Sequence, residues 1–313
     1  MSIDYRVRQS RKLNYANFID LLERVATMPE QNIDTFVNHE QTEITRLKIA
    51  WFFPGNGSNF AAAEIFQTQP AFSRAIERCE DILRSYLLQP LFCVSAMELK
   101  NLSSVEKLRR DRCISFVIEY SLAQLWFAWG IKPQAIMGRG VGELVAATIA
   151  GTIELADALR LVAIQPLQTE EAASASLLRA IKQIRPQIPL ITARKASPSK
   201  NVTPLYWTKY WQQPEIYENP LEVLSDYQLV LTMGTRIEAP NNRDTQYLYS
   251  YGCDSEASWQ EMLQSLGTLY VRGIEIDWSS WQTSDRRTAA AFWRILSHRS
   301  GRSYGNYHHR ARD

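Results

Sequence analysis

The chain has 313 residues, 45% of them hydrophobic and 11% aromatic, and its formal net charge is +2. A chain of this length and composition can bury a large core, so we expect one main domain with extensions. A charge balance so close to neutral argues against wholesale nucleic-acid binding, and we expect no nucleic-acid partner.

Cysteine usage and the start of the chain predict a reduced, cytoplasmic protein. The four cysteines show no short paired spacing, which favours neither a zinc site nor a disulfide framework. They are Cys79, Cys93, Cys113 and Cys253. Residues 1–8 lack the apolar stretch of a signal peptide. The longest apolar segment, residues 113–131, contains Glu119 and Gln124, so it predicts a core helix and not a membrane span. We expect no metal, no cofactor and no membrane contact.

Three regions follow one another along the chain. Residues 1–46 predict a basic leader with one helix near residues 18–25 and a polar linker, while residues 47–282 alternate strand and helix patterns. That alternation predicts an α/β fold, with a mostly parallel sheet flanked by helices. Residues 283–313 accumulate arginine among serine, glycine, tyrosine and histidine, a composition typical of disorder. This tail fits a truncated or out-of-frame ending as well as a basic arm that touches RNA or an acidic partner.

A glycine-framed turn at residues 138–142 (GRGVG) is the most informative motif. It follows the apolar run 135–137, which predicts a buried strand, and precedes an apolar stretch that predicts a helix start. A strand-turn-helix of this kind is typical of a nucleophile elbow, whose sharp reversal needs small residues two before and two after its centre. Gly138 and Gly142 meet that need. At the centre Gly140 tolerates a strained backbone but supplies no nucleophile. An ordinary glycine-containing turn fits the same residues.

Further segments continue the alternation after the elbow. Composition predicts a bridging helix at residues 170–181. The apolar run at residues 189–192 predicts a strand that resumes the core.

Six ordered segments resemble the malonyl/acyl-CoA:acyl-carrier-protein transacylases and the acyltransferase domains of modular polyketide synthases. Residues 53–59 (FPGNGSN) resemble the FPGQGSQ loop that opens the family's domain, and residues 116–151 resemble its helix, strand and elbow. Residues 151–162 resemble the helical segment that follows the family's active-site serine. Residues 206–210 (YWTKY) resemble its Tyr-Trp-x-x-His stretch, with Tyr210 in the place of the histidine. Residues 229–234 resemble the strand before its glycine-proline turn, and residues 269–278 resemble the segment that closes the polyketide synthase domain. The resemblance spans roughly residues 51–281 and implies an acyltransferase, α/β-hydrolase-like core.

The chain departs from the family at the positions that the resemblance assigns to chemistry. Gly140 stands where the family has its nucleophilic serine, and Arg139 stands where it has the histidine before that serine. Gln165 takes the place of the arginine that pairs with a malonyl carboxylate, and Arg112 takes the place of a helix glutamine. Glutamine cannot form a bidentate ion pair, so selection of a dicarboxylic acyl group is not supported. Asn56, in the place of a loop glutamine, and the backbone of Val141 are expected to remain from the oxyanion loop.

No histidine lies between residues 40 and 297, where the family places its catalytic base. The four histidines are His39, His298, His308 and His309, and each is interpreted as a solvated side chain and not as a catalytic base. Acyl transfer through serine needs a base to accept the hydroxyl proton. We therefore expect no catalytic residues.

The family also carries a small ferredoxin-like subdomain that this chain has little room for. Only 29 positions separate Arg160 from Pro189, whereas one βαβ crossover alone takes about 30 residues. We expect the subdomain to be missing.

Two functions of different classes remain open. The first is an acyltransferase-like protein of polyketide or fatty-acid synthesis without acyl-transfer activity, a scaffold or docking element whose partner is an acyl carrier protein or another synthase component. The basic residues Lys107, Arg109, Arg110 and Arg112 would meet an acidic carrier, although a solvated helix face explains them too. The second is an active acyl-CoA:carrier-protein acyltransferase or thioester hydrolase with an unrecognised nucleophile, for which Ser58 is the nearest candidate. A relic without function is a third possibility.

Overall fold

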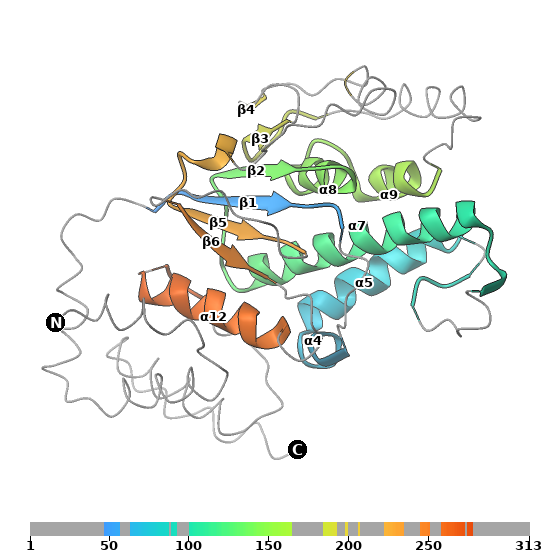
Figure 1. Ribbon diagram of the computed structural model, residues 1–313, viewed down its shortest axis with the longest axis horizontal. Coiled ribbons are helices and arrows are strands. Elements are labelled where there is room, and N and C mark those ends of the chain that lie inside the picture. The colour runs from blue at the N-terminus through green and yellow to red at the C-terminus, as the bar shows by residue number, and fades with distance from the viewer. Residues whose placement is uncertain are drawn as a thin grey trace, which may run out of the picture.

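The computed structural model describes residues 47–56, 63–87, 89–92, 100–164, 184–192, 198–199, 206, 222–234, 245–250, 258–272 and 274–277. Those residues form a six-stranded sheet with helices packed against it (Figure 1). The predicted α/β fold with a mostly parallel sheet is confirmed. The leader, the tail, the bridging helix at residues 170–181 and the missing subdomain were predicted for segments that lie outside the described residues.

The sheet places the carboxyl ends of its central strands at one edge. In sheet order the strands are β4 (Pro198–Ser199), β3 (Leu190–Ile191), β2 (Ala135–Gly138), β1 (Ile49–Phe53), β5 (Leu229–Thr232) and β6 (Gln246–Tyr249). All neighbours pair in parallel except β4, which is antiparallel to β3. The last residue of β1, Phe53, pairs with the last residue of β2, Gly138. Ligand sites of open parallel sheets lie beyond this edge.

Helices cover the sheet and connect its parallel strands. They are α4 (Ala63–Thr68), α5 (Pro70–Leu83), α7 (Ser104–Ala128), α8 (Val141–Ile149), α9 (Leu155–Ile164) and α12 (Ser258–Val271), with the short 3-10 turn η2 (Glu222–Leu224). Figure 1 shows α5, α7, α8 and α9 gathered beside the strands. In the part of the chain that the structure describes, no helix combines the length and apolarity needed to cross a membrane.

The alternation of side chains along β1 explains why the sheet has a core on both faces. Ile49, Trp51 and Phe53 enter the large cluster that also holds the buried faces of the helices, whereas Ala50 and Phe52 enter a second, smaller cluster with residues of β2, β5 and η2. Successive side chains of a strand point to opposite faces, so a strand with no polar residue must be covered on both sides. β1 is therefore the central, fully buried strand.

The long helix α7 is the main support of this core. Its start is fixed by a capping box: Ser103 Oγ accepts a hydrogen bond from the Glu106 N–H at 3.2 Å, and the Glu106 carboxylate accepts one from the Ser103 N–H at 2.8 Å. From Cys113 onward most of its residues are buried. Near its end, Trp126 Nε1 donates to Ser250 Oγ at 2.8 Å, which ties the helix to the end of β6. The core helix predicted for residues 113–131 is confirmed over residues 113–128, whereas residues 129–131 follow the end of α7.

Candidate functional site

The glycine-framed turn has the geometry of a nucleophile elbow. The chain leaves β2 at Gly138, reverses through Arg139 and Gly140, and enters α8 at Val141. Gly140 has φ 57° and ψ −131°, a conformation that side-chain-bearing residues adopt only at a cost. The turn is closed by a hydrogen bond from the Gly142 N–H to the Arg139 carbonyl at 2.9 Å. The predicted strand-turn-helix is thus present.

The two flanking glycines are required by close backbone packing. A Cβ atom on Gly138 would lie 2.1 Å from the carbonyl oxygen of Gly142, and one on Gly142 would lie 2.1 Å from the carbonyl oxygen of Phe53. Atoms cannot approach so closely without displacement of the backbone. The start of α8 therefore lies directly on the end of β1, which is the reason that small residues are needed at both positions.

The tip of the elbow is open. Arg139 and Gly140 are both exposed, and a Cβ atom on Gly140 would meet no heavy atom within 4 Å. The family's serine and histidine are assigned to these two positions by the sequence resemblance alone. Glycine provides no hydroxyl here, and the guanidinium of an arginine is a hydrogen-bond donor and not a nucleophile.

The turn after β1 lies against the elbow. The Arg139 N–H donates to the Phe53 carbonyl at 2.9 Å, so the two turns are bonded to one another. Asn56, the expected remnant of the oxyanion loop, is exposed at the end of this described segment, whereas Ser58 lies outside the described residues. Within the described residues the N–H of Val141 has no acceptor. That amide lies at the positive end of α8, where a helix favours negative charge.

Two other positions assigned by the resemblance are not brought to the elbow by any contact among the described residues. Arg112 is half-buried on α7, and its burial lowers the pKa of the guanidinium from the ordinary value. Gln165 follows the end of α9 and lies outside the described residues. Tyr210 lies outside them too, but Tyr206 of the same motif is described.

Two buried carboxyl groups next to the elbow were not identified as site residues from the sequence. Glu143, in the first turn of α8, is fully buried and accepts a hydrogen bond from the Tyr206 hydroxyl. Glu119, in the middle of α7, is also fully buried and accepts hydrogen bonds from the N–H groups of Gly55 at 2.7 Å and Asn56 at 3.1 Å. The sequence could have identified Glu119, because an acidic residue within an apolar helix is rarely buried without a partner.

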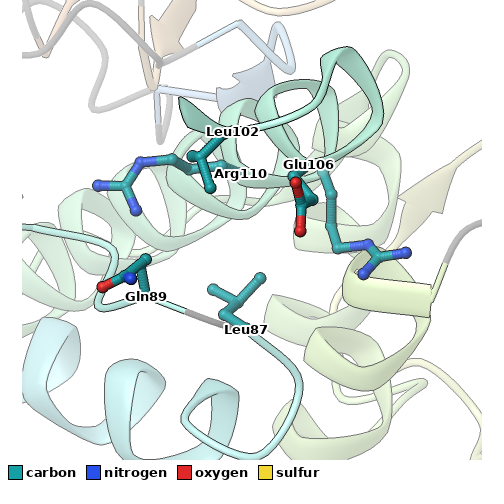
Figure 2. Close-up of a pocket in the computed structure, with 6 residues that line it drawn as sticks. Leu87, Gln89, Leu102, Glu106 and Arg110 are labelled. Atoms are coloured by element: carbon teal, nitrogen blue, oxygen red, sulfur yellow. The ribbon is translucent and has the colours of Figure 1, made fainter. Parts of the chain in front are cut away.

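A small cavity lies between the start of α7 and the chain that follows α5, and Figure 2 shows its lining. Its volume of about 20 Å³ holds about one water molecule, so it cannot bind an acyl group. Its lining residues are Leu87, Gln89, Leu102, Glu106, Arg109 and Arg110.

The cavity wall corrects one prediction about the basic residues of α7. Arg110 is only 9% exposed, and its guanidinium donates to the carbonyl oxygens of Pro90 and Leu91. It anchors this segment and is not available to an acidic partner. Lys107 is exposed and Arg109 is partly exposed.

Residues 50–202 match the family model of the acyl transferase domain, so this part of the chain is similar to that family. Among curated proteins, the chain is 35% identical over 124 residues to the polyketide synthase GfsB of Streptomyces halstedii. The aligned region covers 38% of this chain and 2% of that protein. It is 32% identical over 120 residues to the orsellinic acid synthase armB of Armillaria mellea, and this aligned region covers 37% of this chain and 5% of that protein. The described core is thus an acyltransferase-like domain of polyketide synthases.

Solved structures show the same fold. The acyl transferase domain of ZmaA aligns with a TM-score of 0.65 at 19% identity, over 75% of this chain and 77% of that one. The acyltransferase domain from the second module of the salinomycin polyketide synthase aligns with a TM-score of 0.63 at 16% identity, over 84% and 87%. FabD from Acinetobacter baumannii aligns with a TM-score of 0.56 at 16% identity, over 72% and 99%. In contrast, this chain spans 8% or less of the length of the curated polyketide synthases that it matches.

Proposed function

We propose that this acyltransferase-like domain does not transfer acyl groups and acts as a scaffold or docking element for an acyl carrier protein or another synthase component. The observation that carries the proposal is Gly140. The elbow keeps its strand-turn-helix geometry, yet the residue at its exposed tip has no side chain. Loss of the reacting group with retention of the surrounding packing is what selection for binding without chemistry would leave.

The start of α7 supports a carrier protein as the partner. There Val105 and Leu108 are 41% and 39% exposed, which is unusual for large apolar residues, and the cations Lys107 and Arg109 lie beside them on the same two turns. An apolar contact surrounded by positive charge suits an acidic partner, since opposite charges steer the encounter and fix its orientation. The Glu106 carboxylate at this end is held by the capping box.

The first test is covalent labelling. Purified protein incubated with radiolabelled malonyl-CoA or acetyl-CoA should carry no label after a denaturing gel. The Gly140→Ser variant is the matched comparison, and an active acyltransferase domain is the positive control. Label retained on the unaltered protein would contradict the absence of transfer, and a digest would locate the nucleophile.

The second test is binding to carrier protein, measured by titration calorimetry. We expect binding that weakens when Lys107 and Arg109 are both changed to glutamate. Lys132→Glu is the control, because Lys132 is exposed just beyond the opposite end of α7 and should leave the affinity unchanged. Absence of binding to every carrier protein of the same synthase system would contradict the docking role.

A second candidate function is acyl transfer or thioester hydrolysis by an unrecognised nucleophile. The observation in its favour is the Val141 amide, which remains presented at the elbow as an oxyanion donor would be. Ser58 is the candidate by sequence. Turnover that is lost in Ser58→Ala would support this function, whereas equal turnover in the variant and the unaltered protein would exclude Ser58.

A further inference from the structure

The buried carboxyl group of Glu119 lies where two central strands, β1 and β5, end. It accepts hydrogen bonds from two successive N–H groups of the turn after β1, Gly55 and Asn56. Close to it is also the chain that leaves β5, since a Cβ atom on Gly234 would lie 2.9 Å from Glu119 Oε1 and 3.1 Å from Pro54 Cγ. A group from the middle of α7 thus contacts the turns that follow both β1 and β5.

The turn that Glu119 holds is itself pressed against the elbow. A Cβ atom on Gly55 would lie 2.3 Å from the Arg139 carbonyl oxygen and 3.1 Å from the Val141 nitrogen. The position of Gly55 therefore determines how much room the elbow and its Val141 amide have. Among the described residues the only hydrogen bond that Gly55 makes is the one from its N–H to Glu119.

We propose that Glu119 is the positioning residue of the turn at residues 54–56: one carboxyl oxygen, carried by α7, fixes this turn against the elbow. Burial of a polar group without hydrogen bonds is costly, and two N–H groups directed at one oxygen offset that cost only while the turn stays in place. Position of the turn and burial of the carboxyl group are therefore coupled. This role is independent of whether the domain transfers acyl groups or only docks a synthase component.

The test is amide exchange at Gly55. Pro54-Gly55 is the only Pro-Gly pair in the sequence, so labelling proline with ¹³C at the carbonyl and glycine with ¹⁵N gives one carbonyl-to-amide NMR signal that belongs to Gly55. Glu119→Met keeps the size and apolar packing of the side chain but removes the acceptor, and we expect exchange at Gly55 to rise about tenfold. Glu119→Gln retains an oxygen acceptor and should restore protection. Ser121→Ala, at a second buried polar residue of α7, should change nothing.

Unchanged protection of Gly55 in Glu119→Met would overturn the proposal, because other contacts would then hold the turn. Should that variant fail to fold, Glu119→Gln still decides. Replacement of the carboxyl acceptor by an amide acceptor must move the Gly55 amide proton resonance. A resonance at the same position in both proteins would show that Gly55 does not form a hydrogen bond with this side chain.

Discussion

The burial of Glu119 predicts a specific dependence of stability on pH. Burial raises the pKa of its carboxyl group well above the ordinary value, and the N–H groups of Gly55 and Asn56 offset this only in part. The folded protein therefore keeps a proton that the unfolded chain releases above a pH of about 4.3. Stability from this group is complete below that pH and is lost as pH rises toward the folded pKa.

The magnitude follows from linkage. Between the two pKa values the folded state binds one proton more than the unfolded state, so the free energy of unfolding falls by about 1.4 kcal/mol per pH unit. Glutamine resembles the protonated acid but does not titrate. We therefore expect the stability of the unaltered protein, relative to Glu119→Gln, to fall as pH rises from 5, with this slope while the pH stays below the folded pKa.

Urea unfolding followed by tryptophan fluorescence at pH 5, 6 and 7 measures this difference. Because the two proteins share every other titratable group, their difference isolates position 119. Ser121→Ala serves as the control and should follow the unaltered protein at each pH. Parallel curves for the unaltered protein and Glu119→Gln would refute the reasoning, since they would mean that Glu119 binds its proton equally in both states.

Three more predictions concern the elbow and the buried thiols. Gly140→Ser should remain unlabelled by acyl-CoA and lower the free energy of unfolding by about 1 kcal/mol, because the side chain has room but the positive φ is strained; recovered labelling would contradict the inactive assignment. Gly142→Ala should cost about 2–3 kcal/mol in urea unfolding, because its Cβ would collide with the Phe53 carbonyl; an unchanged midpoint would argue against the close packing. Burial raises the pKa of Cys79 and of Cys113 to about 12. At pH 8 peptide mapping should therefore find both thiols unmodified by a disulfide reagent until the protein is unfolded. Rapid modification of the folded protein would contradict their burial.

The parts of the fold that were predictable from sequence depend on local patterns. The apolar run of β2, the glycines at 138 and 142 and the helix after them identify the elbow without any knowledge of neighbours, since the constraint comes from the chain itself. The Glu119 contact was not predictable in this way, because it joins residues 64 positions apart. Glu143 and Tyr206 are separated by 63 positions and were missed for the same reason.

The burial of Arg110, in contrast, could have been predicted from the sequence. Residues three and seven positions later on a helix share one face, and those positions are Cys113 and Val117, both fully buried. The basic residues of α7 therefore lie on more than one face, and their closeness in sequence does not make them one surface. Helical spacing would have assigned Arg110 to the core and left Lys107 and Arg109 for a partner.

The residues that shape the elbow differ in their packing from Gly140, the position to which the sequence resemblance assigns the nucleophile. Substitution of Gly138 or Gly142 forces backbone atoms apart, so packing alone requires glycine there, with or without a reaction. At Gly140 the surroundings are open, and only the backbone conformation resists a side chain. A side chain at this position would add no packing contact, because a Cβ atom on Gly140 would meet no heavy atom within 4 Å. Glycine there releases the strain and leaves the strands, α8 and the turn held by Glu119 in place. A domain can therefore lose acyl transfer without any pressure from stability, and a binding role for the remaining surface is physically consistent with the fold.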